Sequence, residues 1–377
     1  MHEEIFNLVC VIFISSLFQC HYAIPSTESN ICEYEKGQEI YCNCDSFGVD
    51  EAKQVECWAL QTNGLTVDSA VWDRFTGQRS IVSLIWMAMN QSIKLEFFPL
   101  KALKYASDSI ERFSADDSLN IEVLKEYSLS NITSLAKVFL KHNNIKQLNK
   151  FSFAHLPLLE TLDLTDNMIQ SIHANVFFNL PRLKELFLDR NQIAFIDDYA
   201  FIHLNELNEL DLRLNQITTI TPYTFAGLKK LKNLDLSRNL ISEIPNYAFS
   251  RTPLLRELDF NGNQIKIIHD YAFHNSSHLG TLQLNNNSIK SLPNIVFKGN
   301  PLLVLIDLSQ NKLETIDYDV INQIDNLYKE QFVFYLEGKP SLLLFDIFFC
   351  MTIQSYNHFV NQSIDRLILS MISNQKT

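Results

Sequence analysis

An asparagine returns every 24 residues through the middle of this 377-residue chain. The eight positions are Asn143, Asn167, Asn191, Asn215, Asn239, Asn263, Asn287 and Asn311. Around each asparagine the same apolar frame recurs, L-x-x-L-x-L-x-x-N-x-I-x-x-I-x-x-x-x-F-x-x-L, and eight consecutive copies keep their register without an insertion. A fixed period of this length predicts an elongated array of stacked units.

Each copy predicts a short strand followed by a turn. The alternation of leucine with variable residues has the period of a strand with one buried face. One copy cannot bury its own apolar face, so the copies stack side by side and the strands pair into a parallel sheet with the leucines interlocked behind it. We expect each asparagine amide to satisfy backbone groups of its own copy and of the neighbouring copy.

The frame resembles the leucine-rich repeat. This resemblance implies an α/β solenoid, a right-handed horseshoe with a parallel concave β-sheet and 24-residue repeats of the typical type. A phenylalanine column is expected as a second apolar spine on the convex side, formed by Phe153, Phe177, Phe201, Phe225, Phe249, Phe273 and Phe297. Thr252, Ser276 and Asn300 replace the closing leucine of the last copies. These polar replacements predict looser convex packing towards the C-terminal end.

The chain divides into five predicted segments. They are a signal peptide (1–23), a disulfide-bonded N-terminal cap (24–80), irregular repeats (81–134), eight regular repeats (135–326) and a tail without repeat register (327–377). The first segment has the short apolar run of a secretory signal, with a buried helix as the alternative. Within the irregular segment, Ile81, Leu84 and Trp86 match the start of a copy, whereas the stretch from Glu111 to Leu119 matches poorly. The tail is either an improvised cap or the product of a gene model that has lost the true C-terminus.

Four cysteines precede the repeats at Cys32, Cys42, Cys44 and Cys57. An even set of cysteines in an exported chain indicates disulfides, whereas zinc is the competing interpretation although no C-x-x-C occurs. The C-x9-C-x-C-x12-C spacing is similar to the cysteine-rich N-terminal cap of extracellular leucine-rich repeat proteins. That resemblance implies pairing of Cys32 with Cys44 and of Cys42 with Cys57.

The net charge and the lack of catalytic and phosphate-binding motifs argue against several classes of function. The net charge of −12 and the lack of a basic run argue against nucleic acid, heparin or an anionic membrane as main partners and favour a partner with a basic patch. The sequence contains no G-x-G or P-loop spacing, no H-E-x-x-H and no G-x-S-x-G. We therefore expect no enzyme activity, no catalytic residue, no cofactor and no metal site.

The variable strand positions are the candidate ligand-binding residues, because they point away from the core on the concave face. The middle column is Phe139, Asp163, Phe187, Asp211, Asp235, Asp259, Gln283 and Asp307, and beside it lie Lys141, His142, Asp166, Asp189, Arg190, Arg213 and Arg238. The aromatic residues are the most informative of these, since aromatics are enriched among interface anchors. We expect the N-terminal half of this face to contact the partner.

Five N-x-S/T acceptor sequences predict N-glycosylation, at Asn90, Asn131, Asn275, Asn286 and Asn361. Asn286 is expected at the C-terminal end of the concave face, where a glycan would obstruct a partner, and Asn275 on the convex side. No transmembrane segment is apparent in this chain.

The pattern looks like that of cell-surface leucine-rich repeat proteins such as connectin, chaoptin and Toll-type receptors. The resemblance implies a secreted or cell-surface protein that binds an extracellular or cell-surface protein in recognition or adhesion, with homophilic association as one possibility. The alternatives are a soluble matrix or growth-factor-regulating protein and a secreted immune recognition factor.

Overall fold

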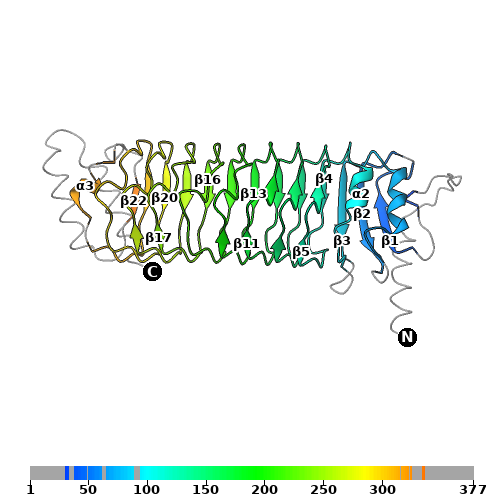
Figure 1. The fold of residues 1–377 in the computed structure, drawn as a ribbon, viewed down its shortest axis with the longest axis horizontal. Helices are drawn as coiled ribbons and strands as arrows, with labels where there is room; N and C mark the ends of the chain where they lie inside the picture. The colour runs from blue at the N-terminus through cyan, green and yellow to red at the C-terminus, as the bar shows by residue number, and fades with distance from the viewer. Residues whose placement is uncertain are drawn as a thin grey trace, which may run out of the picture.

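The computed structural model describes residues 30–33, 38–48, 50–61, 65–88, 94–314, 316–321, 323–324 and 333–335. These residues form an elongated β-solenoid of about eight turns whose coils follow one another in chain order along its long axis (Figure 1). The predicted signal peptide, the sequons at Asn90 and Asn361 and nearly all of the tail lie outside the described residues.

One sheet runs the length of the solenoid and contains thirteen strands in the described part of the chain. In spatial order they are β1 (Ile40–Cys44), β2 (Gln54–Ala59), β3 (Ser83–Met87), β4 (Arg112–Ser114), β7 (Lys137–Phe139), β10 (Thr161–Asp163), β13 (Glu185–Phe187), β15 (Glu209–Asp211), β16 (Asn233–Asp235), β18 (Glu257–Asp259), β20 (Thr281–Gln283), β21 (Leu305–Asp307) and β22 (Val333–Tyr335). Only β1 and β2 pair antiparallel among these strands.

The repeat period sets the register of this sheet. Leu162 lies opposite Leu186, and Leu186 lies opposite Leu210, each one period apart. All three side chains are fully buried, whereas their strand neighbours face outward. The predicted solenoid with a parallel sheet and 24-residue repeats is therefore confirmed.

Shorter elements complete the coils away from the main sheet. They are the paired strands β5 (Val123–Leu124) and β8 (Gln147–Leu148), β11 (Ser171–Ile172) and β14 (Phe195–Ile196), and β17 (Glu243–Ile244) and β19 (Ile267–Ile268), together with the three strands β6 (Leu129–Ser130), β9 (Phe153–Ala154) and β12 (Phe177–Phe178). The helices are η1 (Ala70–Gly77), α2 (Leu100–Tyr105) and α3 (Tyr318–Ile321).

The recurring asparagines form a ladder of buried hydrogen bonds between coils. Asn215 is representative: its amide nitrogen donates to the carbonyl oxygens of Leu188 (2.9 Å), Leu212 (3.0 Å) and Arg213 (3.3 Å). Its side-chain oxygen accepts the N–H of Ile193 at 2.9 Å. Each asparagine thus joins two coils at the point where the chain turns away from the sheet, because the amide is the one side chain that offers a donor and an acceptor there.

The phenylalanine column forms the spine of the convex side. All seven members are buried, and successive rings stack, for example Phe153 on Phe177 with centroids 5.9 Å apart. The polar residues that replace the closing leucine are also buried. Asn300 donates to the carbonyl oxygens of Phe273 and Ser276 at 3.0 Å each, whereas the hydroxyl of Ser276 is buried without a hydrogen-bond partner. The convex side of the last coils is therefore closed by hydrogen bonds as well as by apolar packing.

The N-terminal end contains both disulfides that the cap resemblance implied, Cys32–Cys44 and Cys42–Cys57. Trp72, Phe75 and Trp86 are buried beneath this cap. The cap therefore covers the first coil with a core of its own, which prevents the apolar end of the solenoid from meeting water.

The stretch that matched the repeat poorly does form a strand. β4 pairs in register with β3 and with β7, so Phe113 occupies a core position opposite Val138. What this coil lacks is its own ladder asparagine. Asn143 of the next coil bonds back to it as the later ladder asparagines do to their preceding coils, and its side-chain oxygen accepts the N–H groups of both Ser118 (3.2 Å) and Leu119 (2.8 Å).

Candidate functional site

The outward face of the main sheet is the candidate site, and its side chains fall into three neighbouring zones. The apolar zone comprises Tyr41, Trp58, Ile85, Met87 and Phe139. The paired zone comprises Lys141, Asp163, Asp166, Asp189, Arg190 and Arg213. The acidic zone comprises Glu209, Asp211, Asp235, Glu257, Asp259 and Asp307.

The apolar zone lies on the first strands of the sheet. Tyr41 and Trp58 stack with ring centroids 5.8 Å apart, and Met87 lies opposite Trp58 in the register of β2 and β3. Phe139 is half-buried, with the Arg112 guanidinium 4.3 Å from its ring centroid. These side chains alternate along their strands with buried neighbours, so they face away from the core.

The paired zone is a network of ion pairs across four strands. The Lys141 ammonium lies 2.9 Å from a carboxylate oxygen of Asp163. Arg190 contacts Asp189 at 3.2 Å and Asp166 at 3.4 Å. Arg213 continues the chain of contacts to Asp189 at 3.7 Å.

This network covers two carboxylates of the outward face. Asp163 of the middle column is only 4% exposed, and Asp189 beside that column is only 3% exposed. Neighbouring coils bring cations from other columns over the carboxylates, which the spacing along one column cannot reveal. The remaining charges of this zone are therefore largely neutralised by one another.

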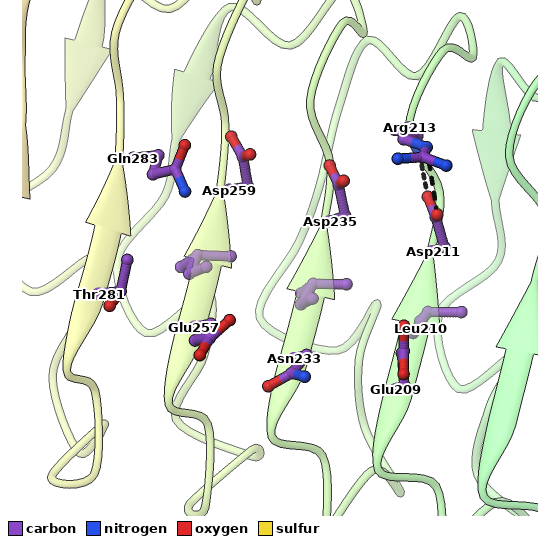
Figure 2. Close-up of a pocket in the computed structure, with 12 residues that line it drawn as sticks. Glu209, Leu210, Asp211, Arg213, Asn233, Asp235, Glu257, Asp259, Thr281 and Gln283 are labelled. Atoms are coloured by element: carbon purple, nitrogen blue, oxygen red, sulfur yellow. Dashed lines mark hydrogen bonds and ion pairs between the residues drawn. The ribbon is translucent and has the colours of Figure 1, made fainter.

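All members of the acidic zone except Asp307 line a shallow hollow of about 230 Å³. Figure 2 shows Asp211, Asp235, Asp259 and Gln283 in one row and Glu209, Asn233, Glu257 and Thr281 in a second row, on four adjacent strands. Asp211 is paired with Arg213 at 3.2 Å. Arg213 is the last cation of the paired zone in chain order. Further along, the carboxylates of Asp235 and Asp259 accept backbone N–H groups from Ser237 and Asn261.

Burial and mutual repulsion perturb the acidic zone. Burial, with the neighbouring carboxylates of Asp189 and Asp235, raises the pKa of Asp211 to about 7 despite the Arg213 contacts. Burial, with the carboxylates of Asp235 and Asp307, raises the pKa of Asp259 to about 6. The pKa of Glu209 is also raised, by burial first and then by Glu185 and Glu257. A cationic group placed over this row would relieve the repulsion.

These shifts predict that stability falls as pH rises. The folded protein holds protons on Asp211 and Asp259 between the unfolded value of 3.8 and the folded values of about 7 and about 6. The stabilising contribution is thus complete below pH 4 and is lost as pH rises through 6 to 7. The double substitution Asp211→Asn and Asp259→Asn should raise the free energy of unfolding by roughly 2 kcal/mol at pH 8 and leave it nearly unchanged at pH 4. Urea unfolding at both pH values measures this.

Asp270→Asn is the matched control, because it removes one negative charge from an exposed position outside the concave face. An equal gain from this control would show that total charge, and not the acidic zone, is responsible.

The other residues expected at the site are distributed more widely. Phe187 is half-buried in register between Asp163 and Asp211. A ring nitrogen of His142 lies 3.5 Å from Asp166. Arg238 and Asn286 lie on the rim, on either side of Gly262: a Cβ added at Gly262 would meet the Arg238 Cγ at 3.4 Å and the Asn286 Nδ2 at 3.6 Å. The predicted set thus shares one face and one rim, and its contacts with one another extend from Lys141 and His142 to Arg213.

Sequence reasoning missed two groups of this face. Glu209 and Glu257 project from the first outward position of their strands, and the repeated E-L-D triplets at 209–211 and 257–259 could have indicated them. Tyr41, Trp58 and Met87 were missed because the cap does not follow the repeat register.

One cluster outside this face has the connectivity of a hydrolytic triad. The Ser171 Oγ lies 3.0 Å from the His173 Nε2, and the His173 Nδ1 lies 3.3 Å from an Asp197 oxygen. The His173 and Asp197 side chains are 47% and 31% exposed, and the same Asp197 oxygen accepts the Ala174 N–H at 2.9 Å. Catalysis needs a pocket that excludes water, so this arrangement is a turn cap and not an active site.

Among the described residues, no three metal-ligating side chains come together, and no helix is long and apolar enough to cross a membrane.

Comparison with known proteins agrees with the repeat geometry. The leucine rich repeat family model matches residues 133–193, 181–241, 229–284 and 277–329, which together span more than half of the chain. Connectin of Drosophila melanogaster is 30% identical over 147 residues, which is 37% of this chain and 20% of Connectin. The chain thus aligns with only a fifth of this relative's length.

Two solved structures share the fold. The TLR13–ssRNA13 complex gives a TM-score of 0.60 at 24% identity, covering 73% of this chain and 38% of that one. The Toll–Spätzle complex from Drosophila gives 0.51 at 20% identity, covering 65% and 37%. The chain shares the fold of these two structures, and it belongs to the leucine-rich repeat family.

Proposed function

We propose that this chain is an extracellular recognition protein that binds another protein through the concave face. The observation that carries the proposal is the grading of this face into an apolar zone, a charge-neutralised zone and an acidic zone. Protein interfaces combine aromatic anchors with a polar surround in this way, and charge complementarity then selects the partner.

The anchor of the contact is the apolar zone. Trp and Tyr dominate the binding energy of protein interfaces, and Trp58 and Tyr41 are half-buried on the open face of β1 and β2. The paired zone beside them has few uncompensated charges, so covering it requires little rearrangement of ion pairs. The N-terminal half of the face therefore suits the central part of a contact, as the position of Phe139 and Phe187 also suggests.

The acidic zone argues for a partner with basic residues at the matching place. A nucleic-acid backbone would meet Asp211, Asp235 and Asp259 with like charge, which disfavours binding. Toll in complex with Spätzle is a related fold that holds a protein, and we extend that mode to this chain as part of the proposal. The two disulfides of the cap support an oxidising compartment, and therefore the secreted or cell-surface location.

The test is to express the full chain in secretory cells, recover it from the medium or the cell surface, and screen it against a panel of extracellular domains, itself included. For any partner found, Trp58→Ala and Phe139→Ala should each weaken binding at least about tenfold. Asp235→Lys should weaken binding further if the partner is basic.

Tyr223→Ala is the matched control, since it truncates an exposed aromatic side chain outside the concave face. Equal loss of binding in this control, or unchanged binding in both concave-face variants, would rule out the concave face as the contact. Recovery in the medium would favour a diffusible or matrix protein, whereas retention at the surface would favour adhesion. Protein that stays in the cytosol would overturn the proposal as a whole.

A further inference from the structure

A row of tyrosines lies exposed on the coils away from the concave face. Tyr199, Tyr223, Tyr247 and Tyr271 occupy the same position in four successive coils, and each is exposed. Tyr247 and Tyr271 stack with centroids 5.5 Å apart and rings within 4° of parallel. Aromatic surface of this extent on a monomer indicates that something covers it.

The residue four positions after each tyrosine approaches the preceding coil. Arg251 holds this position and places its guanidinium 4.8 Å from the ring centroid of Tyr223, one coil back. Asn179, at the same position of an earlier coil, reaches His155 of the coil before it with its amide nitrogen at 3.0 Å. Side chains at this repeat position therefore extend towards the preceding coil, where Arg251 reaches the tyrosine row and Asn179 reaches its own counterpart, His155.

Asn275 occupies this position beside the stacked pair. It is exposed, with a left-handed backbone (φ 68°), and it begins the acceptor sequence Asn275-Ser276-Ser277. The residue before it, His274, packs edge-on against both Tyr247 and Tyr271 with centroids 5.7 Å away. The amide of Asn275 is thus held next to the tyrosine pair.

The opposite side of Asn275 is open. Gly299 holds the same position in the next coil, and a Cβ added there would meet no atom within 4 Å. A bulky group on the Asn275 amide consequently has aromatic surface on one side and free space on the other.

We propose that Asn275 carries an N-linked oligosaccharide whose first sugar lies against Tyr247. The C–H groups of a pyranose ring carry partial positive charge, and the face of an aromatic ring carries partial negative charge, so the two attract while both leave water. The occupant of the tyrosine row is therefore a covalently attached sugar of this chain.

The attachment transfers the oligosaccharide from a lipid carrier to Asn275, with one bond formed and one broken. The Asn275 Nδ2 forms a bond to the anomeric carbon of a polyprenyl-diphosphate-linked oligosaccharide, the bond from that carbon to the diphosphate oxygen breaks, and the amide releases one proton. The inference rests on the proposed function, because this donor is met only on the export route.

Asn131 provides an internal control. It holds the same repeat position, is exposed with a left-handed backbone (φ 57°), and begins the acceptor sequence Asn131-Ile132-Thr133. The residue that corresponds to Tyr247 for this sequon is Leu103, which is fully buried in α2. A glycan on Asn131 thus lacks the counterpart of Tyr247.

The experiment uses the full chain from secretory cells. Glycopeptide mass spectrometry reads the occupancy of Asn131 and Asn275. Thermal unfolding then compares the natural chain with Ser277→Ala, which removes the acceptor sequence but keeps Asn275, with Tyr247→Ala, and with the double variant. We expect Ser277→Ala to lower the Tm by about 2–4 °C in the natural chain and by less than about 1 °C when Tyr247 is already alanine. Thr133→Ala should show no such dependence on Tyr247.

Each outcome decides a separate point. An occupied Asn131 with a bare Asn275 overturns the inference and leaves export intact. An occupied Asn275 whose loss has the same effect with and without the Tyr247 ring overturns the contact. Bare sites at both positions in protein that stays in the cytosol overturn the proposed function, and the inference with it.

Discussion

Asn215→Ala is expected to lower the free energy of unfolding by roughly 3–5 kcal/mol. The substitution removes one accepted and three donated hydrogen bonds at a residue that is only 7% exposed. The buried N–H of Ile193 then loses its partner, which costs about 1–3 kcal/mol, whereas the Leu188 carbonyl keeps its bond from the Asn191 amide at 3.1 Å. The donated bonds that are lost add about 0.5–1.5 kcal/mol each. Denaturant unfolding followed by circular dichroism measures the change.

Asn311→Ala is the matched control for this prediction. Asn311 makes the same four bonds, to Ile289, Leu284, Leu308 and Ser309, but it is half-buried, so water can replace part of what is lost. A markedly smaller loss is expected. Equal losses at the two positions would show that burial does not set the strength of the ladder.

Replacing both Cys42 and Cys57 by alanine is expected to destabilise the cap by about 3 kcal/mol, the typical effect for a closed loop of this size. The disulfide joins residues 15 positions apart that lie directly opposite each other on β1 and β2. Without it the hairpin loosens, and the buried Trp72 and Trp86 beneath it become accessible to water. Tryptophan fluorescence during unfolding, compared with circular dichroism of the repeats, measures whether the cap separates first.

The Cys32–Cys44 pair is the natural comparison. It closes a loop of 12 positions and ties the irregular residues 30–33 to β1, not one strand to another. Its removal by alanine should release those residues while β1 and β2 stay paired. A loss of the whole hairpin from this variant, and none from Cys42 and Cys57, would reverse the roles assigned here.

The repeats show which features of the fold can be predicted from the sequence. Leu162, Leu186 and Leu210 are in register because their spacing equals the length of one coil, so strand pairing follows from periodicity alone. β4 was harder to predict, because its coil lacks a ladder asparagine of its own and its N–H groups at Ser118 and Leu119 donate to Asn143 of the next coil. A hydrogen bond between two coils cannot be predicted from the sequence of a single repeat.

The electrostatics of the candidate site, by contrast, could not be predicted from the sequence. The repeat spacing predicted that Asp163, Asp189 and Asp211 lie on the concave face, but it does not distinguish their electrostatic environments. In the structure Lys141 neutralises the first, Arg190 and Arg213 neutralise the second, and Asp211 has a raised pKa because burial and neighbouring carboxylates outweigh its one arginine. The sequence predicts which residues share a column of the concave face, but their pKa values and ion pairs depend on distances between columns.

The sequence by itself determined the leucine-rich repeat fold, the length of its coils and, through the resemblance of its cap, the disulfide pairs, because each depends on spacing along the chain. Only the tertiary structure decided which aspartates keep their charge uncompensated and which aromatic rings remain exposed. Both depend on side chains of neighbouring coils, such as Lys141 with Asp163 and Tyr247 with Tyr271, meeting at distances of about 3 to 6 Å, and such contacts are set by the stacking of whole coils.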